Sequence, residues 1–157
     1  MNNTTFKTQE NKKGNLQTQT EASRQPSQLI DNMNILLADL HLHYMTLRNF
    51  HWNVTGMSFF TLHEAFENQY DQTKSDIDDL AERIVQSCYR PVARYRDMLA
   101  LSDLKEPDLP LEAREMVAYL VMNLRTIQDN FYDTIPLAGD SNEPVTEDLL
   151  IEIKSHL

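Results

Sequence analysis

The chain has 157 residues, of which 41% are hydrophobic and 24% are charged, and it contains three glycines. This composition is typical of one soluble globular domain and excludes collagen-like and low-complexity chains. The single cysteine, Cys88, cannot form an internal disulfide, and the first thirty residues contain no apolar run of the kind found in secretion or membrane signals. The sequence therefore predicts a cytoplasmic protein that makes no membrane contact.

The formal charge of −10 is unevenly distributed along the chain. Residues 1–28 have a net charge of +2, which leaves −12 on residues 29–157, and the cations of this tail are Lys7, Lys12, Lys13 and Arg24. The tail has too few apolar residues to offset the entropy of ordering, so we predict that it is disordered and that residues 29–157 form the folded domain. An acidic domain favours metal cations over nucleic acid, and the four tail cations are the candidates for a weak DNA contact.

Helix breakers divide the rest of the chain into helix-length segments. Apolar residues at three- and four-residue spacings predict four helices, which begin near Leu29, Phe59, Ala113 and Val145. Ser27 is the expected N-cap of the first, the second ends near Cys88, and the third stops at Pro136. A crossover of about twenty residues between the second and third helices holds a short helix over 94–101. This order indicates an all-α, ferritin-like four-helix bundle.

The second helix carries a polar stripe at the border of its apolar face. His63, Glu67, Asp78 and Glu82 lie within roughly 100° of one another on a helical wheel. One interpretation is an ordinary solvated face. Such a face usually alternates its charges, however, whereas this one is mostly acidic and includes a histidine, so a metal site is the competing interpretation.

A second histidine supports the metal interpretation. His51 lies near the end of the first helix, five residues before Gly56, and His63 lies one turn into the next helix, so the two imidazoles can face each other across the hairpin. Together with Glu67 they form a set of nitrogen and oxygen ligands suited to Fe(II), Mn(II) or Zn(II). Structural zinc sites usually need thiolates, and Cys88 is alone, so iron is the favoured metal.

Asp78 and Glu82 cannot join this cluster within one chain. Eleven residues of helix separate Glu67 from Asp78 by roughly 16 Å, whereas metal–ligand bonds are about 2 Å long. Two chains packed antiparallel about a twofold axis can bring Asp78 and Glu82 of one chain to the histidines of the other. The sequence therefore predicts a metal site shared between two subunits.

The residues around these ligands resemble the Dps (DNA-binding protein from starved cells), or mini-ferritin, family. The resemblance covers about residues 29–155, and its motif comprises His51-Trp52-Asn53-Val54, Gly56, Phe59-Phe60-Thr61-Leu62-His63-Glu64, Phe66-Glu67, Asp78 and Ala81-Glu82-Arg83-Ile84. It implies a hollow dodecamer in which Fe(II) is oxidised by hydrogen peroxide or dioxygen at sites between twofold-related subunits and is stored as a ferric mineral. By position, the ligands of the family fall on His51, His63, Glu67, Asp78 and Glu82.

Two features distinguish this chain from many members of that family. Ser87-Cys88-Tyr89-Arg90-Pro91 stands where many of them have a Gly-Gly-x-Pro turn. The fourth helix of those proteins usually runs about a dozen residues past the position of Leu157, which predicts a shortened last helix here. The resemblance also implies that Glu143, Asp148 and Glu152 line acidic threefold pores, although acids in the first turn of a helix can simply favour its dipole.

Other residues have plainer interpretations. We expect His41 and His43 to be surface or interface groups, Cys88 to be a small buried or half-buried residue rather than a redox centre, and Trp52 to serve packing rather than radical chemistry. The favoured function is a cytoplasmic iron-oxidising and iron-storing cage that protects DNA from oxidative damage. The alternative is a nucleoid-associated cage that mainly binds and compacts DNA through its cationic tail.

Overall fold

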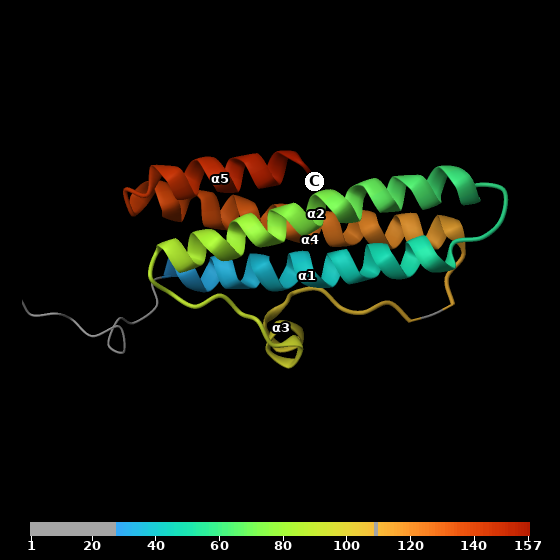
Figure 1. The fold of residues 1–157 in the computed structure, drawn as a ribbon, viewed down its shortest axis with the longest axis horizontal. Coiled ribbons are helices and arrows are strands. Elements are labelled where there is room, and N and C mark those ends of the chain that lie inside the picture. Colours follow the sequence, from blue (N-terminus) through green and yellow to red (C-terminus); the bar gives the residue numbers. More distant parts are fainter. Residues whose placement is uncertain (1–27, 109) are drawn as a thin grey trace, which may run out of the picture.

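The structure, a computed structural model, describes residues 28–108 and 110–157, so the tail and the cap at Ser27 lie outside it. Within these ranges the chain is all-α, and no strand occurs. The helices are α1 (Gln28–Asn53), α2 (Phe59–Gln86), α3 (Tyr95–Leu101), α4 (Ala113–Asp140) and α5 (Pro144–Ser155). The predicted four-helix bundle with a short helix in its crossover is therefore confirmed (Figure 1).

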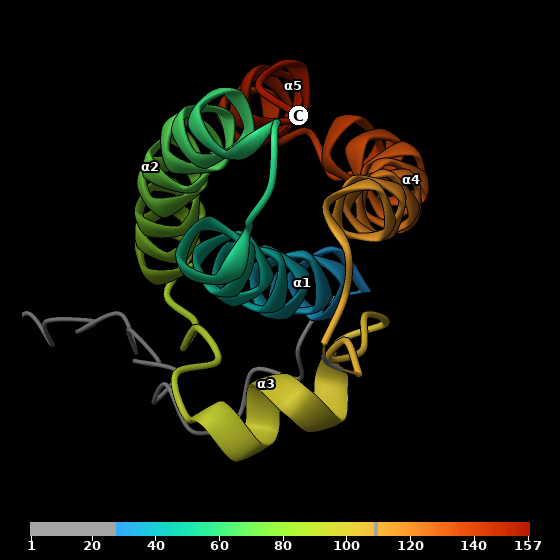
Figure 2. The same cartoon turned by 90° about the vertical axis from the view of Figure 1, so that its right-hand side faces the viewer.

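The four longer helices surround one core, and α3 lies outside them against α1 (Figure 2). Helix α1 is the centre of the packing because it contacts α2, α4 and α3. Helix α5 has 12 residues, against 28 in α2 and in α4, and covers one half of the bundle's length (Figure 1). The other half, where the α1–α2 turn lies, is built from α1, α2 and α4.

A buried carboxylate fixes the crossover to the bundle. Asp39 of α1 is fully buried and accepts hydrogen bonds from the Ser102 hydroxyl, the Asp103 backbone N–H and the Asn130 side-chain amide of α4. Burial raises the pKa of Asp39, and the hydrogen bonds from Ser102, Asn130 and Asp103 oppose that rise. One side chain thus ties α1, α4 and the segment after α3 together.

Helix α4 does not stop at Pro136 as expected. It continues to Asp140, and Pro136 is exposed inside it. A proline lacks one N–H, but Thr134 and Ala138 on either side of it are buried, so their packing holds this turn helical. The helix ends instead at Asp140, and two residues later Asn142 has a φ of 57° and the Glu143 N–H donates to the Ala138 carbonyl.

The end of α2 corrects the expectation that Cys88 is buried or half-buried. Cys88 is exposed and has a φ of 64°, in the left-handed region that favours glycine. Its N–H donates to the Val85 carbonyl, and the Tyr89 N–H donates to the Ile84 carbonyl. Cys88 therefore terminates α2 in the position where helices usually place glycine.

Replacing Cys88 with glycine should stabilise the protein by about 1 kcal/mol, because glycine adopts this conformation without the steric cost of a Cβ atom. The Tm measured by circular dichroism should rise accordingly. Cys88→Ser is the matched control, since it removes the thiol and keeps the Cβ atom, and it should leave the Tm near that of the wild type. An equal rise in both variants would assign the effect to the thiol instead.

The core is divided into two apolar clusters by a polar layer. His43 on α1, Thr73 on α2 and Asn123 on α4 are buried at the positions where one cluster gives way to the other. His43, expected at the surface or in an interface, is completely buried, and neither ring nitrogen has a hydrogen-bond partner within the described part of the chain. Burial lowers the pKa of His43 to about 4, so this imidazole is neutral at pH 7.

We expect His43 to make the protein sensitive to acid. In the unfolded chain the His43 imidazole takes up a proton near the ordinary pKa of 6.5, whereas in the folded chain it does so only near a pKa of about 4. The free energy of unfolding is therefore highest above pH 6.5 and decreases as the pH falls from 6.5 towards 4. The loss from this group should reach about 2 kcal/mol between pH 7.5 and pH 5. His43→Leu should lose correspondingly less stability over that range in urea unfolding. Equal losses in the two proteins would contradict this role of His43.

Candidate metal centre

The α1–α2 hairpin brings the two predicted histidines together. His51 lies in the last turn of α1, and His63 lies in the second turn of α2. Between them the chain reverses at Gly56, whose φ of 89° is one that residues with a side chain rarely adopt, and the Phe59 N–H donates to the Gly56 carbonyl. Val54 is buried beneath this turn and packs in the second apolar cluster, which fixes the hairpin on the core.

The two imidazoles hold each other in one orientation. The Nδ1 atom of His51 lies 2.9 Å from the His63 carbonyl oxygen, and the Nδ1 atom of His63 lies 2.8 Å from the His51 carbonyl oxygen. A carbonyl can only accept, so each Nδ1 carries the proton and each Nε2 keeps its lone pair. The rings stack with their centroids 3.7 Å apart. Hydrogen bonding at the second nitrogen is the usual arrangement of histidines that bind metals.

Glu67 completes a group of three ligands. His51, His63 and Glu67 each offer a ligand atom, and these atoms lie within 4.8 Å of one another. His51 is buried, His63 is half-buried and Glu67 is exposed, so the group opens toward the surface. The donor set of two neutral imidazoles and one carboxylate fits a divalent transition metal. Among the described residues, no other group of three such side chains comes this close.

Asp78 and Glu82 do not join these ligands within one chain. Both are exposed, further along α2. Glu82 lines a groove between α2 and α5, together with the three acids Asp79, Asp148 and Glu152. The intrachain geometry therefore supplies three of the five predicted ligands, and a shared site remains a prediction.

The three predicted pore residues differ in their surroundings. The Glu143 carboxylate accepts a hydrogen bond from Arg83, with 2.8 Å between Oε2 and Nη2, and Arg83 also donates to the Thr146 hydroxyl. Asp148 and Glu152 are exposed in the groove beside α2. Glu143 is thus engaged within the chain, whereas Asp148 and Glu152 face outward.

Aromatic residues surround the three ligands. Tyr70, which is not among the site residues predicted from the sequence, donates a hydrogen bond of 3.3 Å to Glu67 Oε1. Burial, followed by the charges of Glu67 and Asp71, raises the pKa of Tyr70. The sequence could have indicated this contact, because side chains three residues apart on a helix are neighbours and Glu67 and Tyr70 have this spacing.

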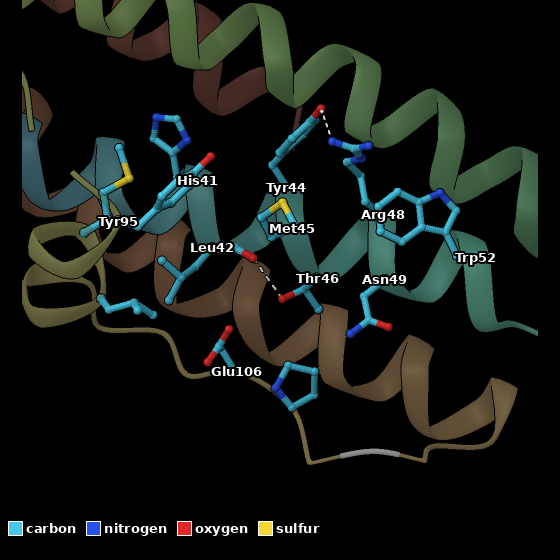
Figure 3. Close-up of a pocket in the computed structure, with 13 residues that line it drawn as sticks. His41, Leu42, Tyr44, Met45, Thr46, Arg48, Asn49, Trp52, Tyr95 and Glu106 are labelled. Carbon is cyan, nitrogen blue, oxygen red and sulfur yellow. Dashed lines mark hydrogen bonds between the residues drawn. The ribbon is translucent and has the colours of Figure 1, made fainter. Parts of the chain in front are cut away.

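A surface groove runs along α1 as far as Trp52, the residue after His51 (Figure 3). Residues of α1, α3 and the crossover line it, including His41, Met45, Trp52, Tyr95 and Leu99. Trp52 is 58% exposed, and the Arg48 guanidinium packs over its ring at 4.7 Å from the ring centroid. The groove therefore offers exposed apolar side chains that extend to Trp52, the residue after His51.

Comparisons with known proteins agree with this fold. The Ferritin-like domain family matches residues 30–156. DNA protection during starvation protein 2 of Bacillus anthracis is 34% identical over 130 residues, which cover 83% of this chain and 89% of that protein. General stress protein 20U of Bacillus subtilis is also 34% identical over 130 residues, covering 83% of this chain and 90% of that protein.

Solved structures give the same result. The crystal structure of Dps from Staphylococcus aureus has a TM-score of 0.78 and 32% identity, and the match covers 81% of this chain and 85% of that one. The Dps protein from Vibrio cholerae, described as a member of a broad superfamily of ferritin-like diiron-carboxylate proteins, has a TM-score of 0.78 and 31% identity over 81% of this chain and 80% of that one.

No helix in the described ranges is both long and apolar enough to cross a membrane.

The chain is a four-helix bundle with a short crossover helix, and the Ferritin-like domain matches nearly the whole length of this bundle. These two findings define the class of ferritin-like proteins. The chain belongs to the ferritin-like family and, within it, to the Dps or mini-ferritin branch. The predicted family is therefore confirmed.

Proposed function

We propose that the protein is a ferroxidase that oxidises Fe(II) with hydrogen peroxide or dioxygen and stores the ferric product inside a hollow homo-oligomer, most simply a dodecamer. Removing Fe(II) and peroxide together would protect DNA from oxidative damage. The observation that carries the proposal is the reciprocal hydrogen bonding of His51 and His63, which leaves both Nε2 lone pairs free beside the Glu67 carboxylate.

The protein's own residues would bind and position the iron substrate. The two imidazoles and one carboxylate bind Fe(II), and a second subunit would contribute Asp78 and Glu82, whose negative charges stabilise Fe(III) more than Fe(II). One hydrogen peroxide molecule accepts two electrons and two protons to give two water molecules, and each Fe(II) supplies one electron. Two Fe(II) ions are therefore consumed for each peroxide molecule.

The groove beside Trp52 supports assembly from two copies. Met45, Trp52, Tyr95 and Leu99 are exposed along it, and a contiguous apolar surface of this kind is typical of interfaces (Figure 3). A second copy that covers the groove would contact Trp52, the residue after His51. Twofold packing there would bring Asp78 and Glu82 of each subunit toward the histidines of its partner.

Three further parts of the proposal concern entry, DNA and location. Asp148 and Glu152 would line the path by which Fe(II) enters the shell, and Glu143, held by Arg83, would have a smaller part in it. Any contact with DNA would involve Lys7, Lys12, Lys13 and Arg24, which lie outside the described residues. A cytoplasmic location fits the proposed reaction, because iron and DNA are both present there.

An anaerobic Fe(II) titration followed by separate additions of peroxide and oxygen tests the function. Light scattering on the same sample gives the size of the particle. We expect saturable Fe(II) binding, rapid oxidation when an oxidant is added, and a closed oligomer that retains the ferric product. A protein that binds no Fe(II), or that oxidises it no faster than buffer does, would contradict the proposal.

A further inference from the structure

Tyr70 touches two of the three clustered ligands. Its hydroxyl donates to Glu67 Oε1, and its ring meets the His51 imidazole edge to face, with centroids 5.3 Å apart and planes at 88°. The same ring also packs edge to face against Tyr44 of α1, with centroids 6.0 Å apart. One side chain of α2 therefore contacts the carboxylate ligand, a nitrogen ligand and the neighbouring helix.

We propose that Tyr70 is a positioning residue of the metal centre, which orients the Glu67 carboxylate and holds the plane of the His51 ring. This inference rests on the proposed function, since it assumes that the three ligands bind a metal ion. Glu67 is exposed and has three rotatable side-chain bonds, so without a partner its carboxylate would sample several rotamers. The phenol engages one carboxylate oxygen and leaves the other oxygen available to a cation.

The hydroxyl and the ring of Tyr70 act on different ligands: the hydroxyl contacts Glu67, and the ring contacts His51. The distance of 3.3 Å from the hydroxyl to Glu67 is at the long end of hydrogen bonds, so this contact selects a carboxylate orientation without locking it. The ring occupies the space between His51 and Tyr44, and this position keeps the imidazole from tilting away from His63. Removing the hydroxyl alone should therefore affect Glu67 and spare the histidines.

Tyr44 provides a matched control in the same cluster. Its hydroxyl accepts a hydrogen bond from Arg48 Nη1 at 3.3 Å, which Figure 3 shows as a dashed line. Arg48 in turn lies between the Tyr44 and Trp52 rings. Tyr44→Phe thus removes a hydroxyl within the same group of aromatic rings, but this hydroxyl belongs to the contact with Arg48.

The experiment compares Co(II) binding by the full-length wild type, Tyr70→Phe and Tyr44→Phe. Hydrogen-bond partners of metal ligands typically contribute between ten- and a hundredfold to metal affinity. We expect Tyr70→Phe to weaken Co(II) binding by about tenfold and to change the visible absorption of the bound ion, because the coordination of Glu67 changes. Tyr44→Phe should bind with the wild-type affinity and spectrum. In Fe(II) oxidation, Tyr70→Phe should raise KM more than it lowers kcat.

Each outcome has a definite meaning. Equal Co(II) affinity and spectrum in the wild type and Tyr70→Phe would overturn the role of Tyr70 and leave the proposed function standing. Equal weakening by Tyr44→Phe would also overturn it, by assigning the effect to the aromatic packing in general. A wild type that binds neither Co(II) nor Fe(II) would overturn the proposed function and this inference together. Far-UV circular dichroism on all three proteins confirms that the helices are intact.

Discussion

Replacing His51 and His63 together with phenylalanine should lower the rate of Fe(II) oxidation by about two orders of magnitude or more, while helicity and particle size stay nearly unchanged. The substitution removes all four ring nitrogens, including both Nε2 lone pairs that the reciprocal hydrogen bonds leave free. Phenylalanine keeps two flat rings, which can occupy the space of the stacked imidazoles. The loss should therefore be one of ligands rather than of fold.

The measurement is stopped-flow absorbance of the ferric product after peroxide or oxygen is mixed with Fe(II)-loaded protein. Glu64→Gln is the matched control, because Glu64 is an exposed acid adjacent to His63 and lies outside the ligand cluster. It should oxidise Fe(II) at nearly the wild-type rate. Wild-type kinetics in the double phenylalanine variant would show that iron is oxidised elsewhere in the protein.

The clustering of the three candidate ligands could be predicted because their positions follow from local rules. A hairpin between two amphipathic helices places residues on either side of its turn close together, and residues four apart on a helix share a face. These two facts bring His51, His63 and Glu67 to one location without any knowledge of the rest of the bundle. The starts of the four long helices and the short crossover helix followed from periodicity and helix breakers in the same way, whereas the end of α4 did not.

The errors concern residues whose surroundings are set by distant parts of the chain. His43 is buried because α2 and α4 both pack on its face of α1, and a helical wheel does not reveal how many helices cover a given face. Cys88 adopts a positive φ because the end of α2 needs that conformation, although residues with a Cβ atom seldom adopt it. Pro136 stays within α4 because the packing of its neighbours outweighs the loss of one hydrogen bond. For His43 and Pro136 tertiary packing overrides a local preference, whereas at Cys88 the hydrogen bonds that end the helix do so.

Mixed shells should reveal whether the metal site is shared between subunits. One variant carries His51→Phe and His63→Phe, and the other carries Asp78→Asn and Glu82→Gln, which keep the shapes of two exposed side chains. Each variant alone should oxidise Fe(II) at close to the background rate, because every site in it lacks either the nitrogen ligands or the partner carboxylates. Neither variant should differ from the wild type in particle size.

Coexpression of the two variants should restore about a quarter of the wild-type rate. In a mixed dimer the histidines of one subunit and the carboxylates of the other are both intact at one of the two sites, whereas the second site lacks both sets. If the subunits pair at random, half of the dimers are mixed, and half of the sites in those dimers work. Mixing the two shells after assembly should restore nothing, which is the control for exchange. If coexpression also restores nothing, the sites are not shared, and if the carboxylate variant alone is fully active, Asp78 and Glu82 are not ligands.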